Sequence, residues 1–476
     1  MVTMCNAELL ERREVPLASM GEFRQGVIEA VEDGARIVAL FGPSPLMSVL
    51  ARGHTSELLW AATEAEASYP SLTPDCPQAH WFEREIAEQN GLIPRGHPWL
   101  KPIRSGGLGD FFRVDGEEVH EVAVGPVHAG VIEPGHFRFQ CHGEQVLHLE
   151  ISLGYQHRGV ERALVGGPDK RTIHYMETLA GDTTVGHAMA YCQAVEALGK
   201  CQVPARAHAL RGIALELERL ANHTGDLGAL AGDVGYLPTM SFCGRIRGDF
   251  LNLTALLCGS RFGRGLVRPG GVGFDVDEQH IGQILERLEQ NRRDVAQAVN
   301  LLWNTSSVRA RFEGTGVVTA RTAHDLGLVG LAARASGLDC DVRHEFPSGI
   351  FRFSQMPIST CHTGDVFARA YVRWLEVQRS LEFVGDQLQS LPTGPVRASL
   401  VGLTPNAMTV SLIEGWRGEI CHVAMTDEQG RFARYKIIDP SFHNWMGLAM
   451  ALRDQQISDF PLCNKSFNLS YCGHDL

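Results

Sequence analysis

Long stretches in the second half of the chain repeat apolar side chains every three to four residues, with charged residues on the opposite face. This pattern is typical of helices that bury one face. The ranges that show it most clearly are 188–200, 205–235, 240–259, 277–304 and 364–391, and a further helix is predicted over 443–454. These segments predict a helical bundle.

Shorter apolar or alternating segments flank the helical stretches and predict strands. Residues 136–140 (HFRFQ) and 145–151 (QVLHLEI) alternate and are joined by a turn at His142 and Gly143. A strand pattern returns over 409–439, with a turn near Gly430. We therefore expect small sheets beside the bundle.

The first hundred residues have a mixed pattern of their own. An amphipathic helix is predicted over 20–32, a buried strand over 35–42 and a second helix over 79–89. The Gly-rich, polar segment 105–120 then marks a domain boundary. We predict an α+β fold with a small α/β domain over 1–110 and a large, mainly helical domain with small flanking sheets over 121–476.

Composition and charge exclude some classes of protein. The formal net charge is −12 over 476 residues, which argues against a nucleic-acid-binding surface. No apolar run approaches the 18 or more residues that a membrane-spanning helix needs. The start of the sequence lacks the basic and apolar regions of a signal peptide. We expect a cytoplasmic chain that reaches a membrane only through partner subunits.

The 12 cysteines are scattered, and no two are three residues apart. A large chain without a secretion signal is not expected to carry a disulfide framework. Cys463 and Cys472 near the end are nine residues apart, which is not the spacing of zinc ligands. We expect buried, reduced thiols, no metal held by this chain, and a C-terminal segment that packs back into the fold.

Three polar groupings are candidates for chemistry. The loop 125–139 carries His128, Glu133 and His136 among glycines and prolines, and the plainer interpretation is a tight structural loop. Glu177, Asp182 and His187 precede a helix, where carboxylates also serve as simple N-terminal caps. A third set shares one face of the helix 205–235: Glu216, Arg219, Asn222, His223 and Asp226. This face is either solvated or a buried charge network inside the bundle, and taken by itself a solvated face is expected.

Several long motifs, in this order, resemble a known family. The motifs are GPVHAGVIEPGHFRF (125–139), GYQHRGVERAL (154–164), LELERLANHTGDLGALAGDVG (215–235), ARASGLDCDVR (333–343), EGWRGEICH (414–422) and IIDPSFHNW (437–445). Together they resemble the large subunit of membrane-bound, group 4 nickel–iron hydrogenases, including formate hydrogenlyase. The forty-nine-kilodalton, quinone-site subunit of respiratory complex I has the same fold. Residues 69–104 resemble the thirty-kilodalton subunit of complex I, which formate hydrogenlyase-type proteins carry ahead of the large domain.

The nickel ligands of that family are missing. In the hydrogenases, two cysteine pairs hold the metals. The first pair would fall at Ala180 and Thr183, between Glu177 and His187, which fit the pattern. The second pair would fall at Ser441 and Asn444, after Asp439. Methyl, hydroxyl and amide groups do not replace soft thiolate ligands, so hydrogen chemistry is not expected here.

Complex I offers the other template, and its quinone pocket is also changed. The resemblance aligns the quinone-binding tyrosine with Gly181 and the quinone-binding histidine with a position near Pro134. His128, Glu133 and His136 are candidates to take over the polar role. The resemblance therefore implies an energy-converting, hydrogenase-related type without nickel.

The function that the resemblance implies is electron transfer within a membrane-associated complex on the inner face of the cell membrane. A small iron–sulfur subunit, like the twenty-kilodalton subunit of complex I, would hold a 4Fe–4S cluster. It would pass electrons to a small acceptor such as a quinone. Membrane subunits would couple this electron transfer to ion translocation. The chain itself would bind no cofactor of its own. Glu177, Asp182, His187 and Asp439 are expected to handle protons in a cavity lined by the four former ligand positions, with Arg417 as its cation. The alternatives are a hydrogenase or formate hydrogenlyase subunit with unusual ligands and a non-catalytic assembly scaffold.

Overall fold

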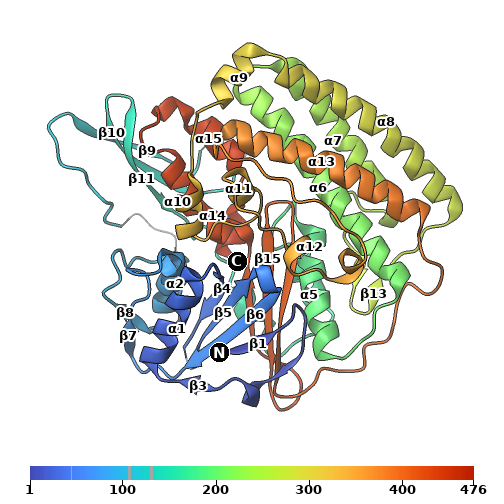
Figure 1. Ribbon diagram of the computed structural model, residues 1–476, viewed down its shortest axis with the longest axis horizontal. Helices are drawn as coiled ribbons and strands as arrows, with labels where there is room; N and C mark the ends of the chain where they lie inside the picture. Colours follow the sequence, from blue (N-terminus) through green and yellow to red (C-terminus); the bar gives the residue numbers. More distant parts are fainter. Residues whose placement is uncertain (44, 106–108, 129–131) are drawn as a thin grey trace.

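The computed structural model describes residues 1–43, 45–105, 109–128 and 132–476. It is an α+β fold, as predicted, in which a helical bundle lies beside several small sheets (Figure 1). No helix in these described ranges is both long and apolar enough to cross a bilayer.

The N-terminal part is built on a five-stranded sheet. Its strand order is β1 (Val2–Met4), β6 (Glu57–Thr63), β5 (Leu46–Arg52) and β4 (Arg36–Phe41), with β3 (Leu17–Ala18) parallel to β6. Helices α1 (Met20–Glu32) and α2 (His80–Asn90) pack on this sheet (Figure 1). A capping box between Ser19 and Glu22 begins α1 at the predicted position, and Gly91 ends α2 in the left-handed conformation.

Four long helices run side by side and form the bundle (Figure 1). They are α6 (Ala205–Asp233), α7 (Leu237–Cys258), α8 (Glu278–Trp303) and α13 (Val366–Gln389). α5 (Thr184–Leu198) packs between α6 and the C-terminal sheet and is apolar on nearly all sides. The predicted long helices are confirmed. Short helices join them: α3 (Val160–Leu164), α4 (Thr172–Met176), α9 (Ser306–Phe312), α10 (Ala320–Asp325), α11 (Gly330–Ala335) and α12 (Val342–Glu345).

Two antiparallel sheets flank the bundle. The first has the order β11 (Gln145–Ser152), β10 (His136–His142) and β9 (Val119–Val124), so the predicted hairpin is confirmed. The second has the order β16 (Phe432–Ile438), β15 (Glu419–Thr426), β14 (Ala407–Glu414) and β2 (Leu10–Glu11). Its two central strands are buried along their whole length, and α5 packs against both of them. Two-stranded pairs complete the strands: β7 (Ser68–Pro70) with β8 (Ile93–Arg95), and β12 (Val267–Arg268) with β13 (Gly271–Val272).

The two predicted domains are joined closely. β2, from the N-terminal part, adds a strand to the C-terminal sheet. Lys436 of β16 pairs with the buried Glu85 of α2 at 2.7 Å, and Arg36 of β4 pairs with Glu419 of β15. The division at 110–121 stays a prediction, and these contacts make the two parts pack as neighbours through buried charges.

The C-terminal segment folds back into the molecule, as predicted. α14 (Pro440–Ala451), α15 (Phe460–Phe467) and α16 (Tyr471–Asp475) are largely buried. Asp475 accepts hydrogen bonds from the backbone N–H groups of Gly154 and Gln156 at 2.8 and 2.9 Å. These contacts hold the last helix beside the start of the large domain.

Candidate functional site

The carboxylate of Glu177 lies at the C-terminal end of α4 and is 3% exposed. Its Oε1 accepts hydrogen bonds from the backbone N–H of Gly265 at 2.7 Å and from Arg268 Nη1 at 2.9 Å. Its Oε2 lies 3.3 Å from Nδ1 of His174. These partners hold Glu177 as a buried anion on the side of β12. Its ion-pair partner Arg268 is not among the residues predicted from the sequence.

Asp182, in the turn before α5, forms a two-pronged ion pair with Arg417. Arg417 donates from Nη1 to Oδ1 at 2.6 Å and from Nη2 to Oδ2 at 2.8 Å. Its Nε donates to the carbonyl of Asn468 at 2.5 Å, and its guanidinium packs over Trp416. The Asp182 side chain is 33% exposed and the Arg417 side chain 5%. The pair therefore presents a carboxylate to solvent above a fixed, buried cation.

His187 and Asp439 meet in the core. His187 lies one turn into α5, and Asp439 is the N-cap of α14, where its Oδ1 accepts the N–H of Ser441 at 2.8 Å. Nε2 of His187 lies 3.0 Å from Oδ2 of Asp439, and its Nδ1 lies 3.1 Å from Nε2 of His422. The sequence prediction thus found two members of a buried cluster and missed His422.

The cluster continues to Tyr435. Its hydroxyl lies 2.9 Å from Nδ1 of His422. His187 and His422 are 0% exposed, Asp439 1% and Tyr435 2%. Burial lowers the pKa of His422 well below its ordinary value, and the neighbouring His187 lowers it further. His422 was visible in the motif EGWRGEICH; Tyr435 gave no signal in the sequence.

The pKa of Asp439 depends on its neighbours. Burial alone would raise it, but the hydrogen bond from His187 and the positive charge of Arg417 outweigh burial and lower it. Asp439 is therefore an anion at neutral pH. It connects the buried cluster electrostatically to Arg417 and so to the Asp182 ion pair.

The four former nickel-ligand positions are packed against other groups of the protein. Ala180, Thr183, Ser441 and Asn444 are at most 2% exposed. Asn444 accepts the N–H of Val329 at 3.0 Å and donates to the carbonyl of the same residue at 3.1 Å. The three cavities described below are lined by other residues. A cavity lined by these four side chains therefore stays a prediction.

The donor groups at these positions do not suit nickel or iron. The hydroxyl of Ser441 accepts the N–H of Ser470 at 2.8 Å. Thr183 Oγ1 accepts from Trp416 Nε1 at 3.2 Å and from Arg417 Nη1 at 3.3 Å. In the described residues no group of three or more His, Cys, Asp or Glu side chains could hold a metal ion.

The loop before β10 contributes Glu133 to the neighbourhood of Asp182. Oε2 of Glu133 accepts the N–H of Tyr471 at 3.3 Å. Burial raises the pKa of the Cys472 thiol to about 11, helped by the adjacent carboxyl of Glu133, and the same thiol is hydrogen-bonded to the backbone of Gly181. We call Glu133, Gly181, Asp182 and Cys472, all of them at least partly exposed, the Asp182 rim.

The two histidines of the loop have partners other than Asp182 and Arg417. His136 is 2% exposed and its Nδ1 lies 3.2 Å from the carbonyl of Gly125. His128 packs its ring against Phe137 and Tyr471. Burial lowers the pKa of both histidines. Nε2 of each ring is buried without a hydrogen-bond partner among the described residues, so a polar role for these histidines stays a prediction. Residues 129–131 lie outside the described residues.

The polar face of α6 is buried, so the expectation of a solvated face is wrong. Its side chains are at most 9% exposed. Arg219 pairs with Glu216 at 3.0 Å and with Glu376 of α13 at 3.3 Å. Nε2 of His223 lies 2.7 Å from Glu376. Spacing alone showed a shared face, but the partners on α13 that bury it are more than 150 residues away.

Glu218, one residue from this face, caps α5. Its carboxylate accepts the backbone N–H groups of Val185 at 2.7 Å and Gly186 at 3.1 Å. Glu177 and Asp182 therefore do not act as the simple caps of this helix. Burial raises the pKa of Glu218 to about 8, against the lowering effect of these two hydrogen bonds.

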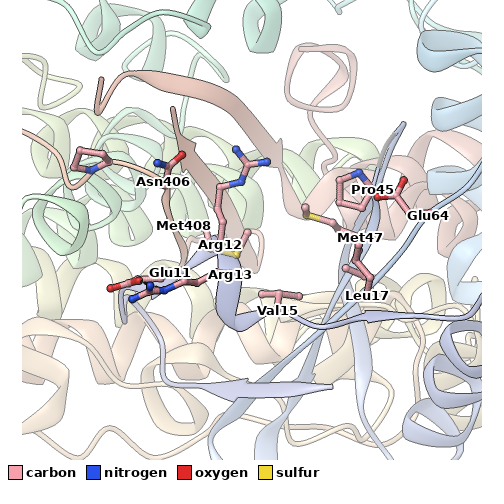
Figure 2. A pocket seen from close by; sticks show the side chains of 12 residues that line it. Glu11, Arg12, Arg13, Val15, Leu17, Pro45, Met47, Glu64, Asn406 and Met408 are labelled. Carbon is pink, nitrogen blue, oxygen red and sulfur yellow. Dashed lines mark ion pairs between the residues drawn. The ribbon is translucent and has the colours of Figure 1, made fainter. Parts of the chain in front are cut away.

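Three cavities differ in how they relate to these positions. One of about 770 Å³ lies between the β2–β3 segment, β5 and β14, with Arg12, Met47 and Met408 on its walls (Figure 2). Another, of about 1030 Å³, lies at the C-terminal end of α5. The third, of about 10 Å³, lies between α5, α6 and α7 and contains Asp182 and Glu218. Of these three, only the smallest contains a predicted site residue, and it has room for about one water molecule.

Known proteins resemble the chain over most of its length. The sequence pattern of the respiratory-chain NADH dehydrogenase 49 Kd subunit matches residues 233–408, and that of the 30 Kd subunit matches residues 46–105. Formate hydrogenlyase subunit 5 of Escherichia coli (strain K12) is 30% identical over 432 residues, 85% of this chain and 76% of that protein. The carbon monoxide-induced hydrogenase of Rhodospirillum rubrum is 31% identical over 353 residues, 73% of this chain and 97% of that protein.

The chain belongs to the family of hydrogenase large subunits and their complex I counterparts. NADH-quinone oxidoreductase subunit 4 of Thermus thermophilus is 29% identical over 369 residues, 72% of this chain and 90% of that protein. This family is one of oxidoreductase subunits. The resemblance found in the sequence is confirmed. It includes an N-terminal part of this chain, ahead of the part that matches the 49 Kd subunit, which matches the smaller 30 Kd subunit of complex I.

Proposed function

We propose that this chain is a nickel-free electron-transfer subunit of a membrane-associated respiratory-type complex. A small partner subunit with a 4Fe–4S cluster would deliver electrons, and a small acceptor such as a quinone would receive them at the Asp182 rim. Membrane subunits of the same complex would couple the reaction to ion translocation. The chain would sit on the cytoplasmic face of the membrane and bind no cofactor of its own.

The proposal rests on a contrast between two sets of residues: the former ligand positions are buried, whereas the carboxylate of the Asp182–Arg417 pair is partly exposed. Ala180, Thr183, Ser441 and Asn444 are buried and offer no thiolate to hold a metal. Arg417 is a buried cation beside an exposed carboxylate. A cation in that place favours an acceptor that gains negative charge on reduction, because its field stabilises the reduced form.

Protons would be supplied by the acids of the same region. Asp182 is partly exposed to solvent, and Glu218 shares the small cavity with it. A pKa of about 8 keeps Glu218 largely protonated at neutral pH, so it can give up a proton when the charge nearby changes. Glu177 and Arg268 would then set the electrostatic background rather than exchange protons.

Replacing Asp182 with asparagine tests this proposal. Asp182→Asn keeps the size of the side chain but removes an acid that would supply protons to the reduced acceptor, so we expect quinone-analogue reduction by the purified complex to fall at least tenfold. The control is Asp249→Asn, which removes an anion from a surface pair with Arg245 on α7. Circular dichroism and subunit content should be unchanged in both variants.

The outcomes separate the candidate functions. An Asp182→Asn complex that reduces the acceptor as fast as the unmodified complex contradicts the assignment of the rim. A correctly assembled wild-type complex that reduces no acceptor at all favours the assembly-scaffold alternative instead.

A further inference from the structure

The buried cluster of Asp439, His187, His422 and Tyr435 has one fully paired arrangement of hydrogens when Asp439 is ionised and both rings are neutral. The carboxylate only accepts, so Nε2 of His187 donates to it across 3.0 Å. Nδ1 of His187 then accepts the Nε2 hydrogen of His422 at 3.1 Å. Nδ1 of His422 accepts the hydroxyl hydrogen of Tyr435 at 2.9 Å.

Reversing every donor and acceptor gives a second arrangement in which each ring nitrogen is again paired. Asp439 is then protonated and donates to His187 Nε2, His187 Nδ1 donates to His422 Nε2, and His422 Nδ1 donates to the oxygen of Tyr435, which keeps a hydrogen of its own. This second state holds one more proton than the first, and the proton resides on the His187–Asp439 pair. Two such states that differ by one proton are what a proton carrier needs, because neither leaves a buried ring nitrogen without a partner.

The two ends of the cluster lie near different parts of the surface. Asp439 is close enough to Arg417 for each charge to shift the pKa of the other group, and Arg417 holds the partly exposed Asp182. At the other end, the ring of Tyr191 lies 6.4 Å from that of Tyr435. Burial raises the pKa of Tyr191, and the charges of Cys192 and Asp169 add to this effect, which places Tyr191 near Asp169, whose side chain is half exposed.

The geometry points to a proton relay that runs through Asp439, His187, His422 and Tyr435 between the Asp182–Arg417 pair and the surface near Tyr191. One proton enters at Tyr435, the hydroxyl passes its own hydrogen to His422, and each ring passes one onward until the His187–Asp439 pair holds the added proton. No electron moves within the relay. The relay rests on the proposed function in one respect, that the Asp182 rim takes up protons when its acceptor is reduced.

The relay is tested by hydrogen exchange at a buried ring in the full-length protein. Nitrogen-15 histidine labelling and NMR would follow exchange of the His187 Nε2 hydrogen with solvent at pH 7–8. Tyr435→Phe removes only the hydroxyl, and we expect it to slow this exchange at least tenfold. Tyr371→Phe, on α13 against Phe367 and Trp303, is the matched control and should leave the rate unchanged.

A second variant covers the case in which Tyr435→Phe does not fold. His422→Gln interrupts the relay at its centre and should slow exchange at His187 by a similar factor. An exchange rate equal to that of the wild type in a folded Tyr435→Phe or His422→Gln protein overturns the relay. Failure of the proposed function would appear differently, as a wild-type complex that reduces no acceptor while the exchange result stands.

Discussion

Replacing Arg334 with methionine is expected to lower the free energy of unfolding by about 3–5 kcal/mol. Arg334 is 0% exposed and pairs with Glu376 at 2.5 Å and Glu414 at 2.8 Å. Methionine fills much of the same volume but leaves Glu414 buried without its closest cation. The loss of a buried partner, rather than the loss of packing, therefore sets the size of the effect.

The measurement is the shift of the urea denaturation curve, followed by circular dichroism. Arg379→Met is the control, because Arg379 and Glu382 form a pair that is 44% and 53% exposed. Surface pairs of this kind contribute less than about 1 kcal/mol. Equal shifts in the two variants would contradict the view that Arg334, Glu376 and Glu414 form a buried, mutually dependent set of charges.

Glu218 is expected to make the protein less stable as the pH rises from about 5 to 8. Its pKa is about 8 in the folded protein against an ordinary value of 4.5, so the folded state binds more protons in this range than the unfolded state. The contribution is fully present below pH 4.5 and is lost as the pH rises through 8, with a slope of at most about 1.4 kcal/mol per pH unit.

Glu218→Gln should remove this slope while keeping the shape of the side chain. Urea denaturation of the two proteins at pH 5, 6, 7 and 8 measures it as a difference between curves, so contributions from other groups cancel. Glu286→Gln, at an exposed position of α8, should leave the pH profile unchanged. A Glu218→Gln profile parallel to that of the wild type would mean that Glu218 is ionised throughout this range in the folded protein.

The sequence predicted the local structure well where one pattern dominated. The helix over 20–32 has the same bounds in the structure, because a capping box fixes its start and its apolar face packs on the first sheet. Strands β5 and β6 were not predicted, since their alanines, leucines and methionines also suit helices. β2 could not be predicted at all, because two residues pair with a strand nearly 400 positions away.

The candidate site was predicted only in part for a similar reason. Motifs supplied Asp182, His187, Asp439 and Arg417, and the structure brings them into neighbouring contacts. The partners that determine their chemistry come from elsewhere. Tyr435 and Glu218 carry no distinctive spacing, and the burial of the α6 face depends on side chains from other helices. Long-range packing decides which polar residues are buried, and spacing along one helix does not show it.

The central claim is that this chain functions without nickel, although it belongs to a family that includes nickel hydrogenases. Elemental analysis of the complex, purified with its partner subunits, tests this most directly. The account predicts iron in the amount of the partner's iron–sulfur clusters and less than one nickel atom per ten copies of this chain. Near-stoichiometric nickel, accompanied by hydrogen evolution, would contradict it and show that the chain is an active nickel hydrogenase subunit.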